Sequence, residues 1–100
     1  MTIYTIQRLS NCSIEERETR IGEEERVTLG SSPYADLQLH LSFGLPQVCL
    51  EVWYEIDRCL AENVSRNPEL VLLNGQPIYT VVQLENGDLI EIGNDSFAVV

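Results

Sequence analysis

Apolar and polar side chains alternate over short stretches along most of the chain, and a two-residue period is typical of β-strands. The clearest example is the segment 48–56. One of its predicted faces carries Val48, Leu50, Val52, Tyr54 and Ile56, and the other carries Cys49, Glu51, Trp53 and Glu55. The pattern therefore predicts a half-buried strand with Trp53 among its outward-pointing residues.

Similar β-rich runs follow one another along the chain, separated by turn-forming residues. We predict strands over residues 2–9, 27–30, 35–39, 48–56, 70–73, 78–82, 89–92 and 96–100, with turns at 11–13, 31–34, 74–75 and 93–95 and a loop over 57–68. The charged stretch 15–26 is predicted to form short edge strands joined by an acidic turn, because charge on an edge strand prevents edge-to-edge aggregation. The spacing predicts an all-β sandwich of about ten to eleven short, mainly antiparallel strands.

Length and composition support one soluble domain over residues 1–100. The 100 residues are 44% hydrophobic, which suffices for a single modest core. We expect an intracellular chain without a signal peptide or a membrane span. Cys12, Cys49 and Cys59 are odd in number and lack metal-ligand spacing, so they are expected to be reduced thiols rather than disulfide or zinc sites.

Charge excludes one class of function. Sixteen acidic residues face six basic residues, all of them Arg, which gives a formal net charge of −10. A nucleic-acid-binding surface needs a basic patch to release counterions, so we expect no nucleic-acid contact. The same field opposes a phosphopeptide unless a local arginine pocket overrides it.

Three motifs in the second half carry a resemblance to a known family. They are Ser65-Arg66-Asn67-Pro68, Asn74-Gly75 and the run from Leu84 to Gly93. In this order and spacing they resemble the C-terminal half of a forkhead-associated (FHA) domain, and the resemblance extends over residues 22–100. The family is an all-β sandwich that reads phosphothreonine, so the resemblance implies that fold and a candidate phosphopeptide site.

The first half departs from the family at the residues that hold phosphate. Ser31 stands where the family has Arg, and a Ser hydroxyl offers one neutral donor in place of a charged, planar fork. The family's phosphate-binding Ser falls on Gly44 or Leu45, and its bracing His falls on Gln47 or Val48. Ser65 and Asn67 match the family, although Pro68 replaces the usual Gly. We interpret these two matches as loop architecture rather than a working binding site.

No constellation for catalysis or for a cofactor stands out. His40 is the only histidine, and the sequence contains no motif that would pair it with a catalytic nucleophile. We therefore interpret His40 as structural. Asp36 and Asp88 match structural turn and strand positions of the family. We therefore predict a non-enzyme that needs no metal and no cofactor.

Two functions stay open on the sequence. The first is a degenerate FHA domain that has lost phosphothreonine binding and acts as a protein-interaction module, most simply by homodimerisation. The second is a working phosphothreonine reader with a relocated pocket. The start at Met1 suggests the N-terminal module of a longer chain, which resembles the mediator of DNA damage checkpoint family and its insect relative Mutator 2. That resemblance implies a nuclear scaffold of the DNA-damage response.

The predicted dimer surface comes from apolar residues that alternation leaves outside. It contains Trp53 and Cys49 on one strand, with Tyr79, Val81 and Val82 as a second cluster. A contiguous exposed apolar patch usually marks an interface, and aromatic residues are common anchors in one. The alternative is that Trp53 lies under the 57–68 loop.

Overall fold

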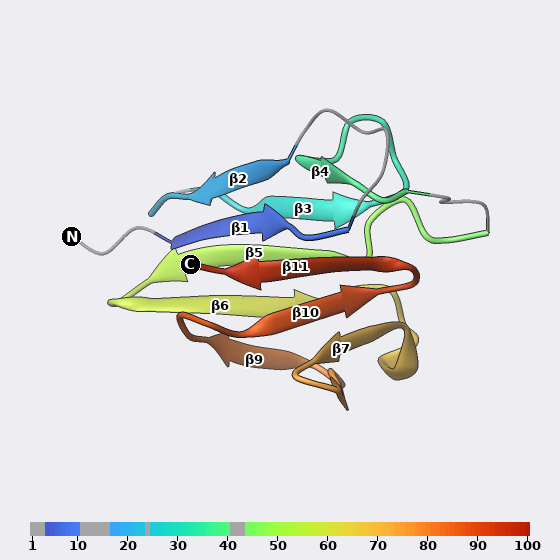
Figure 1. Ribbon diagram of the computed structural model, residues 1–100. Coiled ribbons are helices and arrows are strands. Elements are labelled where there is room, and N and C mark those ends of the chain that lie inside the picture. Colours follow the sequence, from blue (N-terminus) through green and yellow to red (C-terminus); the bar gives the residue numbers. More distant parts are fainter. Residues whose placement is uncertain (1–3, 11–16, 24, 41–43) are drawn as a thin grey trace.

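The computed structural model describes residues 4–10, 17–23, 25–40 and 44–100, and in these ranges it is a sandwich of two β-sheets (Figure 1). The all-β sandwich predicted from the sequence is confirmed, with eleven strands among the described residues. The start of the first predicted strand at 2–3, the predicted turn at 11–13, Cys12 and residues 15–16 lie outside the described residues.

Each sheet is built mainly of antiparallel neighbours. The first has the order β2 (Glu18–Ile21), β1 (Tyr4–Arg8), β11 (Asp95–Val99), β10 (Leu89–Ile92), β7 (Val71–Leu73) and β8 (Gln76–Pro77). The second has the order β4 (Leu37–Gln38), β3 (Val27–Gly30), β5 (Leu50–Glu55), β6 (Arg58–Asn63) and β9 (Val81–Leu84). Only β3 and β4 run parallel among the described pairs, and a 3₁₀-helix, η1 (Pro68–Leu70), precedes β7.

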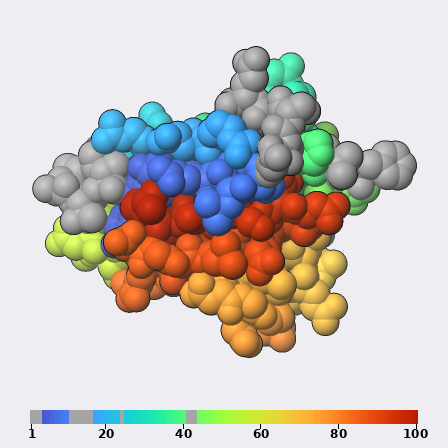
Figure 2. All heavy atoms as spheres, viewed as in Figure 1, coloured from blue at the N-terminus to red at the C-terminus, as the bar shows by residue number. Residues whose placement is uncertain are grey.

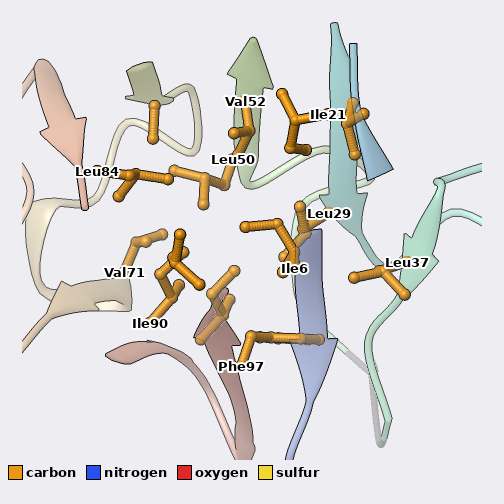
Figure 3. Close-up of a cluster of buried hydrophobic side chains, with 14 of the residues drawn as sticks. Ile6, Ile21, Leu29, Leu37, Leu50, Val52, Val71, Leu84, Ile90 and Phe97 are labelled. Carbon is orange, nitrogen blue, oxygen red and sulfur yellow. The ribbon is translucent and has the colours of Figure 1, made fainter. Parts of the chain in front are cut away.

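The core fills the space between the sheets, and both contribute to it (Figure 3). Ile6, Ile90 and Phe97 from the first sheet meet Leu29, Leu50 and Val52 from the second. Within β5 the predicted alternation holds, because Leu50, Val52 and Tyr54 are buried while Glu51 and Trp53 are only partly covered. Burial of alternate side chains from both sheets is what holds the layers together.

The predicted strand 48–56 is too long at both ends. The alternating register begins only at Leu50, and Cys49 is fully buried rather than outward-facing. Its backbone N–H donates to the Leu29 carbonyl and its carbonyl accepts from the Val64 N–H, which holds Cys49 inside. At the other end, Ile56 lies in a turn with a φ of 48° and is 80% exposed.

The loop predicted over 57–68 is wrong, because residues 58–63 form β6. The turn between β5 and β6 places Ile56 and Asp57 at φ values of 48° and 59°. Such turns normally carry Asn or Gly, so the usual turn signal is missing from the sequence. Trp53 therefore does not lie under a loop: it pairs across the sheet with Leu60.

Three other boundaries differ from the prediction. β4 covers only Leu37–Gln38, and β9 begins at Val81, after a buried Ile78. The Asn74-Gly75 turn is confirmed, with positive φ at both residues between β7 and β8. The last turn is shorter than predicted, since Asp95 already pairs with Ile92 in β11.

A buried ion pair that the sequence did not reveal connects β1 to β11 of the first sheet, and its arginine also bonds to the second sheet. The Arg8 guanidinium donates from Nη1 to Asp95 Oδ1 at 3.0 Å and from Nη2 to the Gln38 carbonyl of the other sheet. Asp95 Oδ2 accepts from the His40 backbone N–H at 2.7 Å, and the guanidinium lies 5.2 Å from the centre of the Phe97 ring. Both charged side chains are almost fully buried, so each depends on the other.

Replacing Asp95 by Ala should lower the free energy of unfolding by about 3–5 kcal/mol, because it leaves the buried Arg8 charge unpaired. Urea unfolding followed by the fluorescence of Trp53, the single tryptophan, measures the change. Glu85→Ala, at an exposed position, is the control and should stay within about 0.5 kcal/mol of the original protein. A loss below about 1 kcal/mol at Asp95 would contradict the role assigned to the pair.

Two core thiols should make stability fall at alkaline pH. Burial raises the pKa of Cys49 and of Cys59 from an ordinary 9.0 to about 11. Because the folded protein disfavours the thiolate, the stability from the neutral thiols is fully present below about pH 9 and is lost as the pH rises through about 11. We expect a level melting temperature near neutral pH and a decline above about pH 9.5 that Cys49→Ala with Cys59→Ala makes shallower. An equal decline in the double variant would exclude the thiols as its cause.

Candidate functional site

Three connections meet at one end of the sandwich, on the right of Figure 1. They are the β3–β4 connection at 31–36, the described part of the β4–β5 connection at 44–49, and the β6–β7 connection at 64–70. The Ser31 N–H donates to the Pro46 carbonyl, and the Val64 N–H donates to the Cys49 carbonyl. The middle connection is therefore tied to both of the others through the backbone.

Gly30 brings the end of β3 against the backbone of the middle connection. A Cβ at this position would stand 1.9 Å from the Gln47 carbonyl oxygen, so only glycine fits. The close approach allows the Ser32 N–H to donate to that same oxygen at 3.2 Å. The position of the Leu-Gly-Ser segment 29–31 is thus determined by close packing between its backbone and that of the middle connection.

Ser31, which the sequence resemblance places where the family has Arg, directs its side chain toward the Leu45 backbone. Its Oγ donates to the Leu45 carbonyl at 3.0 Å, and its own carbonyl accepts from the Gln38 side chain at 3.3 Å. The hydroxyl is half-buried and its proton is already used in this contact. Ser31 therefore braces the middle connection in the structure.

The sequence resemblance assigns the family's phosphate-binding Ser to Gly44 or Leu45 and its bracing His to Gln47 or Val48, and none of these four residues carries a hydroxyl or an imidazole. Gly44 is exposed with a φ of +80°, a conformation that would strain a serine. Leu45 packs against the core, and Gln47 is exposed. Val48, the alternative to Gln47, is half-buried.

Ser65 and Asn67 take part in a hydrogen-bond network centred on Asn63. Ser65 Oγ donates to Asn63 Oδ1 at 2.6 Å and accepts from the Asn67 N–H at 3.1 Å. Asn67 Oδ1 accepts from the Glu69 N–H and caps η1, with Pro68 at the first helical position. Asn63 Nδ2 donates to the Ile78 carbonyl at 2.7 Å, which ties the loop to the segment before β9.

Sequence reasoning missed Asn63, because nothing distinguishes an Asn at the end of an unrecognised strand from an exposed polar residue. It also assigned no role to Arg66, which is exposed between Ser65 and Asn67 with a φ of +67°. The guanidinium of Arg66 is thus the cation carried by the β6–β7 connection. Its backbone conformation turns the loop at that point.

The remaining polar candidates have structural contacts. Asp36 Oδ2 accepts from the N–H and the hydroxyl of Thr28 at 2.8 and 3.2 Å. Asp88 accepts from Asn74 Nδ2 and from the Glu85 N–H, and so joins the β7–β8 turn to the β9–β10 turn. Among the described residues, no group of three His, Cys, Asp or Glu side chains is placed to hold a metal ion. In the same residues, no helix is long and apolar enough to cross a membrane.

The Trp53 ring, the first predicted dimer anchor, is covered by Arg26. The guanidinium of Arg26 stacks 3.9 Å from the ring centre and bonds Glu51 at 2.8 Å and Glu62 at 3.3 Å. The hydrogen bond with Glu51 is the largest cause of the raised pKa of Arg26. On this outward face of β5 and β6, the Trp53 ring is thus covered by a guanidinium that is itself paired with two glutamates.

The second predicted cluster divides between surface and core. Tyr79 is 73% exposed and Val81 is 46% exposed, as expected for surface residues. Val82 instead packs against the core, because neighbouring residues of β9 point to opposite faces. With Cys49 also buried, Tyr79 and Val81 are the members of the predicted interface that stand well exposed.

Comparison with known proteins rests on structure alone. No family model matches the sequence, and no curated protein matches it either. Solved structures do match over nearly the whole chain. An FHA domain from Chlamydia trachomatis has a TM-score of 0.81 at 20% identity, and covers 99% of this chain and 97% of its own.

Two further matches come from work on phosphothreonine recognition. An FHA domain solved in a study of phosphothreonine-dependent interactions has a TM-score of 0.78 at 21% identity, over 98% of this chain and 95% of its own. The MEK1 FHA domain in complex with a HOP1 phosphothreonine peptide has a TM-score of 0.75 at 17% identity, over 97% and 94%. This chain has the FHA-domain fold. At these identities the likeness shows the fold alone.

Proposed function

We propose that this FHA domain is a protein-interaction module that has lost phosphothreonine recognition and associates with a second copy of itself. The observation that carries the loss is the contact from Ser31 Oγ to the Leu45 carbonyl. A hydrogen bond to a charged partner contributes about 1.5–3 kcal/mol, and an arginine fork would supply two of them. At position 31 the described structure offers one neutral hydroxyl that is already donating.

Long-range electrostatics point the same way. The chain carries a formal net charge of −10, so a dianionic phosphate approaches against the field of the whole domain. Self-association is the simplest interaction left to a module without its ligand pocket. It is supported by Tyr79 and Val81, which are 73% and 46% exposed on neighbouring parts of the chain.

The alternative function is a phosphothreonine reader with a relocated pocket. The solved FHA domains of the same fold include one bound to a phosphothreonine peptide, which is the reason to keep this alternative. Arg66 is the observation that favours it, because it places an exposed guanidinium between Ser65 and Asn67. A relocated pocket would use Arg66 in place of the arginine that the family has at position 31.

The proposed cellular setting is a nuclear scaffold of the DNA-damage response. It rests on the sequence resemblance to the mediator of DNA damage checkpoint family, and it stays a prediction. Neither an enzymatic activity nor a cofactor is part of the proposal.

Titration with a degenerate library of phosphothreonine peptides at low salt tests the loss of recognition. We expect no peptide to bind more tightly than about 10 μM, because that affinity corresponds to about 7 kcal/mol and requires charged contacts. The proposal would be wrong if a peptide bound with a lower dissociation constant than this and lost its binding on dephosphorylation. If Arg66→Ala then removes the binding, the relocated pocket is the correct function.

The repair variant Ser31→Arg with Gly44→Ser measures how far the site has changed. If the two lost residues were the whole defect, this variant would gain weak affinity for the same peptides. We expect this variant to fold but to bind none of the peptides. The substitution at position 31 removes the hydrogen bond to the Leu45 carbonyl, and a serine at position 44 would be strained at a φ of +80°. Ser31→Ala is the matched control, since it removes the brace without adding a cation.

A further inference from the structure

Four strands form the edges of the two sheets, and an edge strand pairs with other chains unless something protects it. β2 is protected by charge, since Glu18 and Arg20 are both exposed on it. β4 and β8 have two residues each, and one of those in β8 is Pro77. These three edges therefore carry the usual devices that prevent strand pairing.

The fourth edge, β9, carries none of these devices. Its sequence Val-Val-Gln-Leu contains no charge and no proline. It ends an uncharged stretch that runs from Leu70 to Leu84, in a chain of which 22% is charged. Figure 2 shows the gold and orange segment that includes this stretch projecting at the lower side of the molecule. Within this uncharged stretch, Tyr79 is 73% and Val81 is 46% exposed.

The backbone groups that point away from the sheet can be assigned from the ladder. The Asn63 N–H donates to the Thr80 carbonyl at 3.0 Å, so Thr80 directs its carbonyl toward β6. Hydrogen-bonded and non-hydrogen-bonded pairs alternate in an antiparallel ladder. Val82 and Leu84 then also bond to β6, and Val81 and Gln83 direct their N–H and C=O groups toward the open edge.

We propose that the open edge of β9 pairs antiparallel with β9 of a second copy, so that the two five-stranded sheets become continuous. The inference deepens the proposed self-association and rests on it. A two-fold axis beside Val82 places Val81 of one chain opposite Gln83 of the other. In this register, the N–H and C=O groups of Val81 and Gln83 in each chain all form hydrogen bonds with the other chain.

The uncharged edge of β9 suits a second copy as the occupant, because charge restricts where two copies can meet. Two copies with a formal charge of −10 each repel one another wherever their carboxylates meet. At β9 they can meet through an uncharged strand whose donors and acceptors match those of an identical strand. The face that carries Trp53 is a weaker candidate for the contact between two copies, because the Arg26 guanidinium over the ring is already bonded to two glutamates of the same chain.

Sedimentation equilibrium on the whole domain, from about 5 to 200 μM, tests the pairing with three variants. Val81→Pro removes a donor on the open side and leaves the β6 ladder intact. Val81→Glu with Gln83→Glu places carboxylates opposite each other in the proposed register. Val81→Lys with Gln83→Glu is the matched control, because there each lysine faces a glutamate of the partner.

We expect the original protein to reach twice the 11.3 kDa of one chain. The proline and double-glutamate variants should raise the dissociation constant by at least about tenfold, and the lysine–glutamate variant should stay within about threefold. Unchanged Trp53 fluorescence and circular dichroism confirm that each variant is folded. A dimer that none of the variants weakens would overturn the β9 pairing and leave self-association standing. A monomeric original protein at all concentrations would overturn both.

Discussion

An added Cβ at Gly30 would stand 1.9 Å from the Gln47 carbonyl oxygen, and the geometry of the candidate site depends on this contact between two backbones. It sets the distance at which the Ser31 and Ser32 N–H groups reach the carbonyls of Pro46 and Gln47. With the backbones this close, a short side chain at position 31 reaches the Leu45 carbonyl. Ser31 thus contributes to the stability of the loop that it contacts.

The same end of the sandwich is fixed from the other side by the Arg8–Asp95 pair. Asp95 accepts from the His40 N–H, in the part of the β4–β5 connection that directly follows β4, while Arg8 reaches the Gln38 carbonyl. The site is therefore held by a buried charge pair on one flank and by the Asn63 network on the other. Groups committed to such contacts are costly to redirect, because each would leave a buried partner unsatisfied.

The sequence sufficed for the fold class because periodicity and turn residues act locally. The Asn74-Gly75 turn and the alternation within β5 were predicted for that reason. β6 was missed because its hairpin turn uses Ile56 and Asp57, which carry no turn signal. Residues whose role depends on distant partners could not be predicted: Arg8 meets Asp95 across 87 positions, and Cys49 is buried by contacts with Leu29 and Val64.

Amide hydrogen exchange measured by two-dimensional nuclear magnetic resonance tests most directly whether the loops are committed to their own contacts. We expect slow exchange at the Ser31 and Ser32 amides, because they donate to the carbonyls of Pro46 and Gln47. We also expect the chemical shifts of both amides to stay unchanged when a phosphothreonine peptide is added. Fast exchange at both amides, with shifts that follow the phosphorylated peptide and not its unphosphorylated form, would contradict these expectations.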